Sequence, residues 1–213
     1  MVTLARLPKH IALTVESLDP QDLRLILSAV EQCIARKIPV MSFLVLAPKM
    51  NIADFSIGMD SLAGFLSEVS TAKVIHENQV KVSILGKWYD LPGRVVDNAK
   101  KVIEETKDYD GHFLNLCINY DGQEEIVAAC QLVAMQVKSE RIDPLVISKE
   151  VVKENLYSSY FIPPDLLIKS GKAVLPSLLV WDSPGAVIYF TNRPWSMFTE
   201  HCLLEAIQHW SNC

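Results

Sequence analysis

Three short segments of this sequence carry side chains that could do chemistry. Glu16 follows an apolar run and offers a carboxylate that could act as a base or as a Mg²⁺ ligand, although such a residue more often caps a helix. The tripeptide YDG at 120–122 could present backbone amides to an anion, or serve only as a turn between a strand and a helix. The tetrapeptide KSGK at 169–172 lacks the GxxxxGK[ST] spacing of a phosphate-binding loop.

Histidine and cysteine spacings exclude the common metal sites. The five histidines share no spacing typical of metal ligands and are better explained as surface or core residues: His10, His76, His112, His201 and His209. The five cysteines contain no CxxC pair: Cys33, Cys117, Cys130, Cys202 and Cys213. We therefore expect neither a zinc site nor a disulfide framework, and a protein of the reducing cytoplasm.

Composition restricts the class of partner. The 213 residues include 20 basic and 25 acidic side chains, a net charge of −5, and no block of lysine or arginine stands out. This excludes the electrostatic footprint of a nucleic-acid-binding protein. Hydrophobic residues make up 50% and the mean hydropathy is +0.20, yet no charge-free apolar run reaches the roughly 18 residues of a membrane helix. We expect a cytoplasmic protein without a transmembrane segment, for which peripheral membrane contact stays open.

Short apolar runs alternate along the chain with longer amphipathic stretches. The apolar runs predict strands at residues 10–15, 38–46, 81–85, 113–120, 166–169, 178–181 and 186–190. Helical apolar spacing predicts helices at residues 21–37, 53–77, 92–107, 122–138, 148–156 and 200–210. This alternation predicts an α/β fold with a mostly parallel central sheet flanked by helices, in a single domain over residues 1–213. Ligands of such sheets bind beyond the carboxyl ends of the strands, where all three segments named above would lie.

Several segments, in order along the chain, resemble the cis-prenyltransferases, the family of undecaprenyl and dehydrodolichyl diphosphate synthases. LNLCINYDGQEEI at 114–126 is similar to the family block LNIAxxYGGRxEI, and DLLIKSG at 165–171 is similar to DLxIRTxGE. LLVW at 178–181 and IYFT at 188–191 match a further block, and HIALTV at 10–15 lies where the first block would be. The resemblance implies the fold of that family and the Mg²⁺-dependent condensation of isopentenyl diphosphate with an allylic diphosphate.

Departures from the family pattern fall on residues that would hold the diphosphates and the metal. Glu16 stands where the resemblance places an Asp that binds Mg²⁺ and diphosphate, and Val187 stands at a second metal position. The diphosphate-binding residues that are replaced are two arginines, by Gln123 and Lys169, and an arginine and a serine, by Val174 and Pro176. Gln123 and Lys169, together with Ser170 and Gly171, are expected to form a weak, vestigial anion site. Losing these contacts removes on the order of 5–10 kcal/mol of oriented binding.

The pattern is closest to the non-catalytic, Nogo-B-receptor-like subunits of heteromeric cis-prenyltransferases. We expect a catalytically silent or strongly impaired partner of a catalytic subunit, the two making long-chain polyprenyl diphosphate for lipid carriers such as dolichol. No catalytic residue is assigned beyond the vestigial Glu16, no cofactor is expected on this subunit, and Mg²⁺ is expected on the catalytic partner. Two alternatives stay open: a divergent homodimeric cis-prenyltransferase that uses Glu16 and Mg²⁺, and a prenyl-lipid-binding protein.

The two ends of the sequence add two expectations from the same resemblance. Residues 208–213 lack the RxG tail common among these subunits, so we expect no contribution of that kind to a partner's active site. No membrane segment precedes residue 10, so we expect an archaeal or prokaryotic source rather than an animal one.

Two groups of apolar residues complete the expected site. The resemblance implies a hydrophobic tunnel between the sheet and the helices at 53–77 and 92–107. Residues at helical spacing within 53–77 are candidates for lining it, with core packing as the alternative: Phe55, Met59, Leu62, Phe65 and Leu66. The resemblance also implies a dimer interface at the C-terminal strands, for which bulky residues in and after the strand at 186–190 are candidates: Tyr189, Phe190, Trp195 and Phe198. The expected partner is a catalytic cis-prenyltransferase subunit or a second copy of this chain, with isoprenyl diphosphates bound by the complex and no nucleic acid.

Overall fold

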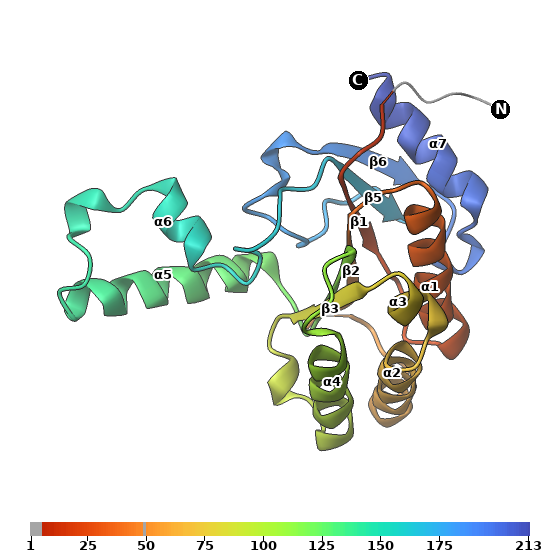
Figure 1. Ribbon diagram of the computed structural model, residues 1–213, viewed down its shortest axis with the longest axis horizontal. Helices are drawn as coiled ribbons and strands as arrows, with labels where there is room; N and C mark the ends of the chain where they lie inside the picture. Colours follow the sequence, from red (N-terminus) through yellow and green to blue (C-terminus); the bar gives the residue numbers. More distant parts are fainter. Residues whose placement is uncertain (1–5, 49) are drawn as a thin grey trace.

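Six parallel strands form the sheet around which the chain folds (Figure 1). The computed structural model describes residues 6–48 and 50–213. The strands are β1 (His10–Thr14), β2 (Val40–Leu46), β3 (Val80–Leu85), β4 (His112–Ile118), β5 (Leu166–Ser170) and β6 (Val187–Thr191). Their order across the sheet is β3-β4-β2-β1-β5-β6, and every neighbouring pair is parallel. The predicted α/β class with a parallel central sheet is confirmed.

Within these described ranges, seven α-helices accompany the strands: α1 (Pro20–Ala35), α2 (Phe55–Val69), α3 (Lys73–Glu77), α4 (Gly93–Thr106), α5 (Gly122–Lys138), α6 (Lys149–Glu154) and α7 (Glu200–Ser211). Buried residues of α1, α2, α3, α4 and α7 share one hydrophobic core with one face of the sheet. Side chains alternate between the two faces of a strand, so that Ile11 and Leu13 of β1 join this core while Ala12 joins a smaller one on the opposite face. Burial on both faces explains why the strands read as continuous apolar runs.

The second face of the sheet is covered mainly by irregular chain. Its core contains Leu178 and Leu179, with Tyr157 and Phe161 packed against it. Helix α5 projects away from the sheet and α6 leads the chain back, so that the two form an arm beside the body of the molecule (Figure 1). The arm leaves large apolar side chains more than 40% exposed, among them Val127, Leu132, Met135 and Leu145.

The strand order brings distant segments together at the carboxyl edge of the sheet. Strand β1 lies between β2 and β5, so the chain leaves β1 toward one side of the sheet and leaves β5 toward the other. A crevice at such a switch point is the usual ligand site of an open parallel sheet. In this chain Glu16 follows β1 and Lys169 lies in β5, so the fold places both residues at that point.

Two predicted elements differ from the structure. The helix predicted at 53–77 is two helices, and the first of them, α2, ends at Val69. The hydroxyls of Ser70 and Thr71, just after this end, donate to the carbonyl of Ser67. The strand predicted at 178–181 is a turn. Its backbone turns at Leu179, whose φ is 48° and whose carbonyl accepts from the amides of residues 182 and 183.

Candidate functional site

Glu16 and Lys169 form an ion pair at the switch point of the sheet. The Lys169 ammonium lies 3.2 Å from Oε1 of Glu16, and it also donates to the carbonyl of Ser170. The side chains are only 32% exposed for Glu16 and 15% exposed for Lys169. The structure thus brings together the predicted vestigial carboxylate and the predicted vestigial cation, and it neutralises one with the other.

The second oxygen of Glu16 has a partner that the sequence did not indicate. The backbone N–H of Trp195, at the start of a single 3₁₀ turn (Trp195–Met197), donates to Oε2 at 3.4 Å. The carboxylate also lies against Gly171, where a Cβ would sit 2.1 Å from Oε1. Gly171 has a φ of +69°, a conformation that glycine adopts without strain. The backbone therefore favours a glycine here, and any larger residue would also displace the Glu16 carboxylate from its present position.

Gln123, the remaining predicted diphosphate residue, lies in a different hollow. It occupies the first turn of α5, where its backbone N–H donates to the N-cap side chain of Asp121 at 2.8 Å. It lines a cavity of about 310 Å³, whose described lining includes Lys87 and Tyr157 but neither Glu16 nor Lys169. The predicted anion site is thus divided over two places along the carboxyl edge.

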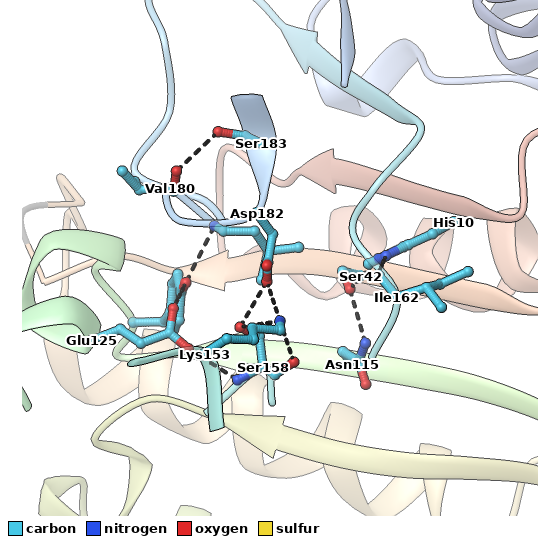
Figure 2. Close-up of polar contacts among 12 residues, drawn as sticks. His10, Ser42, Asn115, Glu125, Lys153, Ser158, Ile162, Val180, Asp182 and Ser183 are labelled. Atoms are coloured by element: carbon cyan, nitrogen blue, oxygen red, sulfur yellow. Dashed lines mark hydrogen bonds and ion pairs between the residues drawn. The ribbon is translucent and has the colours of Figure 1, made fainter. Parts of the chain in front are cut away.

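A buried polar network, not anticipated from the sequence, fixes the base of the arm to the sheet (Figure 2). Glu125, 1% exposed, accepts from the hydroxyl of Tyr120 at 2.5 Å and from the amide of Ser158 at 3.0 Å. Burial raises the pKa of the Glu125 carboxyl, and the two donated hydrogen bonds act against that shift. Beside it, Asp182 accepts from the Lys153 ammonium at 2.6 Å and from the Ser158 hydroxyl at 2.9 Å. Carboxylates this deeply buried are stable only with such partners.

A second buried chain of hydrogen bonds crosses three strands (Figure 2). His10 Nδ1 lies 2.7 Å from the carbonyl of Ile162 and must donate to it, which leaves Nε2 to accept from the Ser42 hydroxyl at 2.8 Å. Ser42 in turn accepts from the Asn115 amide at 2.9 Å. Burial lowers the pKa of His10, so the ring is neutral near pH 7. This histidine is a satisfied core residue.

Comparison with known proteins identifies the family of this chain. The family model described as "Putative undecaprenyl diphosphate synthase" matches residues 21–213. The chain belongs to this family. The matched range begins after Glu16, in agreement with the departure that the sequence shows at the first block.

Several members of the family can be compared with the chain directly. A tritrans,polycis-undecaprenyl-diphosphate synthase (geranylgeranyl-diphosphate specific) of Methanocaldococcus jannaschii is 34% identical over 144 residues, which are 66% of this chain and 51% of the relative. An isoprenyl transferase of Halalkalibacterium halodurans is 36% identical over 132 residues, 62% of this chain and 52% of the relative. The chain thus spans about half the length of the curated relatives that it matches.

A solved structure shares the fold over almost the whole chain. Lavandulyl diphosphate synthase from Lavandula x intermedia, in complex with dimethylallyl diphosphate, matches with a TM-score of 0.89. The match covers 96% of this chain and 95% of the other, at 21% sequence identity. At that identity the likeness shows the cis-prenyltransferase fold, and the chemistry of this chain has to be argued from its own residues.

A Mg²⁺ ion at the switch point of this cis-prenyltransferase-family chain would compete with the groups that hold Glu16. Glu16 is the carboxylate at the expected position, and both of its oxygens accept from groups of the chain itself. Within residues 6–48 and 50–213, no group of three or more His, Cys, Asp or Glu side chains could hold a metal ion. Mg²⁺ usually keeps several waters and binds through one or two carboxylates together with substrate phosphates. Glu16 could supply one such carboxylate only after leaving Lys169 and the Trp195 amide.

Val187, the second expected metal position, lies at the other end of the sheet. It begins β6 and pairs with Leu166, which in turn pairs with Ile11. Residue 16 is five positions beyond residue 11, which is about 16 Å along the strand direction. Positions 16 and 187 of one chain therefore lie too far apart to bind the same metal ion.

The expected tunnel stripe is divided between the core and the surface. Four of its members are at most 2% exposed and belong to the main hydrophobic core: Met59, Leu62, Phe65 and Leu66. Phe55, at the start of α2, is 56% exposed. A hollow of about 360 Å³ at the start of α2 is lined by Leu18, Ile57 and Gly58 among others, and Phe55 is not part of that lining. A tunnel along the stripe stays a prediction.

Two of the four interface candidates are core residues. Trp195 is 1% exposed and Phe198 is 6% exposed, and their rings stack on each other with centroids 4.8 Å apart. The expectation that they form an interface is wrong, because neither ring has surface left for a partner. Tyr189 is partly buried beside His209, and Phe190 is 40% exposed. An interface at these two residues stays a prediction.

The helices of the structure can be compared with the length and hydropathy that a membrane span needs. In the part of the chain that the structure describes, no helix combines the length and the apolar character needed to span a bilayer.

Proposed function

We propose that the chain is a subunit of a prenyltransferase that makes long-chain polyprenyl diphosphate, and that it is silent or strongly impaired by itself. The observation that carries this proposal is the pairing of Glu16 with Lys169 at the switch point. The carboxylate that would bind a metal and the cation that would bind a phosphate neutralise each other. A catalytic partner subunit then has to supply Mg²⁺ and a complete diphosphate site.

The charges at the site support the proposal that a partner subunit supplies the catalytic site. Condensing two diphosphate substrates requires several negative charges to be held close together, normally by arginines and a divalent cation. Here Gln123 is neutral and lines another hollow, while Lys169 is already paired. Each missing charged hydrogen bond is worth about 1.5–3 kcal/mol, and about 1.4 kcal/mol corresponds to a tenfold change in rate. Several such losses together reduce turnover by thousands-fold or more.

A second candidate function is autonomous prenyl transfer. It is favoured by the relatives, which are named as an isoprenyl transferase and an undecaprenyl-diphosphate synthase. In that case Glu16 would have to leave Lys169 and serve the reaction. A prenyl-lipid-binding role without transfer is the third reading, and it depends on a tunnel near α2.

A transfer assay separates these candidates. The purified chain is incubated with geranylgeranyl diphosphate, labelled isopentenyl diphosphate and Mg²⁺, alone and together with a family member from the same genome that has the complete metal and arginine motifs. The proposal expects no product from the chain alone. It expects the co-purified pair to form product faster, or to form a product of greater chain length, than that family member alone. Robust transfer by the chain alone, lost in Glu16→Gln, would establish the second candidate. Binding of a polyprenyl diphosphate without transfer or pairing would establish the third.

A further inference from the structure

Glu16 is held in the way that a bound phosphate oxygen pair would be held. Oε1 accepts from the Lys169 ammonium at 3.2 Å and Oε2 accepts from the Trp195 amide at 3.4 Å. The carboxylate rests directly on the backbone of Gly171, where any side chain would collide with it. An ammonium and a backbone N–H are groups that proteins use to bind oxyanions, and the absence of a side chain at Gly171 leaves room for one, although the Gly171 N–H itself donates to the Arg193 carbonyl. In this chain they bind an oxyanion of the chain itself.

Space for an external anion lies next to this carboxylate. A hollow of about 700 Å³ is bordered by Glu16, Ser17, Arg24, Pro194 and Ser196, as well as by Asp19 and Asp22. The Arg24 guanidinium pairs with Glu68 at 3.2 Å, but both side chains are more than 40% exposed, so this pair is weak. Asp22 is already bonded to the hydroxyl of Ser17. Arg24 borders the hollow directly, whereas Lys169 does not border it and is connected to it through Glu16.

We propose that Glu16 is an internal competitor that occupies an anion-binding site formed by Lys169, the Trp195 amide and Gly171. The competing ligand is a phosphate or diphosphate group, free or at the head of a prenyl chain. This inference rests on the proposed function for the class of ligand, and it reverses the role of Glu16, which blocks the anion site instead of serving it through a metal. Removing the charge of Glu16 abolishes the ion pair with Lys169, whose ammonium keeps its hydrogen bond to the Ser170 carbonyl, and allows an entering anion to displace the side chain at position 16.

Anion binding without metal tests this directly. Inorganic pyrophosphate is titrated by calorimetry, in EDTA, into the wild type, Glu16→Gln, Glu16→Gln with Lys169→Met, and Glu104→Gln. The last variant is the matched control, because Glu104 is an exposed carboxylate of α4 that pairs with Lys107. We expect Glu16→Gln to bind at least about tenfold more tightly than the wild type, which is ~1.4 kcal/mol. The double variant and Glu104→Gln should bind as weakly as the wild type.

Two further arms make the result decisive. Geranyl diphosphate replaces pyrophosphate in one, and an equal gain with both ligands shows that the head group is what the site recognises. In the other, Glu16→Ala replaces Glu16→Gln should the latter fail to fold. The backbone amide signal of Trp195 is followed by NMR during this titration. Equal or weaker anion binding by these variants overturns the inference. No transfer step enters the measurement, so the proposed function can fail in the transfer assay while this inference stands, and the reverse.

Discussion

The hydroxyl of Tyr120 donates a hydrogen bond of 2.5 Å to the carboxylate of Glu125 inside the second core of the molecule. The same hydroxyl accepts from the backbone N–H of Leu179 at 3.2 Å. One phenol oxygen therefore joins the end of β4, the first turn of α5 and the turn that covers the second face of the sheet. Burial raises the pKa of Tyr120 far above its usual value, so the hydroxyl keeps its proton and remains a donor.

Tyr120→Phe should destabilise the protein. The substitution removes one hydroxyl and leaves both the Glu125 carboxylate and the Leu179 amide without that partner inside the core, which costs about 1–3 kcal/mol per unsatisfied group. Urea unfolding followed by circular dichroism measures the difference. Tyr160→Phe is the control, since Tyr160 is 92% exposed and its loss should leave the midpoint unchanged. Equal midpoints for both variants would show that the network adds nothing to stability.

Local sequence signals predicted most of the helices and strands. The contacts of the candidate site depend on residues that are far apart in the sequence. Helix α5 has the predicted bounds because its start is encoded locally, by the Asp121 side chain that accepts from the first amides of the helix. Glu125 looks like an ordinary first-turn acid, and its burial depends on Ser158, which lies 33 residues further on. The pairing of Glu16 with Lys169 follows from β1 lying beside β5, which depends on the order of strands in the folded sheet.

His10 should make stability fall in mildly acidic solution. Burial lowers its pKa in the folded state, so below about pH 6.5 the unfolded chain binds a proton that the folded chain does not. The stabilisation is complete above the unfolded pKa and is lost as the pH falls toward the folded one. Unfolding free energies of the wild type and His10→Gln, measured between pH 7.5 and about 5, should differ in slope.

The His10 comparison includes its own check on other groups. The pKa of Glu125 is raised, so its contribution has the opposite sign: it is present below the unfolded pKa and is lost as the pH rises through the folded one. Because Glu125 is present in both proteins, its effect cancels in the difference. Parallel pH profiles would mean that His10 titrates alike in the folded and unfolded chain.

Gly171→Ala should be costly, and part of the cost should disappear when Glu16 is shortened. The φ of +69° strains any side chain by roughly 1 kcal/mol, and the new Cβ would collide with Oε1 of Glu16. In a Glu16→Ala background only the backbone strain remains. A double-mutant cycle on thermal unfolding should therefore show a coupling of at least about 0.5 kcal/mol between the two positions. Strict additivity would place the Glu16 carboxylate away from Gly171.

Trp195→Ala should weaken the fold itself. The indole packs edge-on against Phe43 at 6.1 Å, and its N–H donates to the carbonyl of Asp22 at 2.8 Å. Truncation of such a buried ring costs about 3–5 kcal/mol, a large part of the stability of a domain this size. Chemical denaturation should show a midpoint far below that of Met197→Ala, which removes a 65% exposed neighbour. A variant that unfolds like the wild type would return Trp195 to the list of interface candidates.

Phe190→Ala should weaken association while leaving the folded chain intact. Phe190 is 40% exposed on β6, an edge strand of the sheet whose residues Val187–Thr191 carry no charge. An exposed aromatic on an unpaired edge is a natural anchor for a second subunit, whether a copy of this chain or a catalytic relative. Loss of an aromatic anchor costs about 2 kcal/mol or more, which is roughly a 30-fold weaker dissociation constant by sedimentation or co-purification. Urea midpoints should stay unchanged because the ring is already partly in water. Unaltered association by this variant would move the interface away from β6, and the exposed apolar side chains of α5 would be the next surface to substitute.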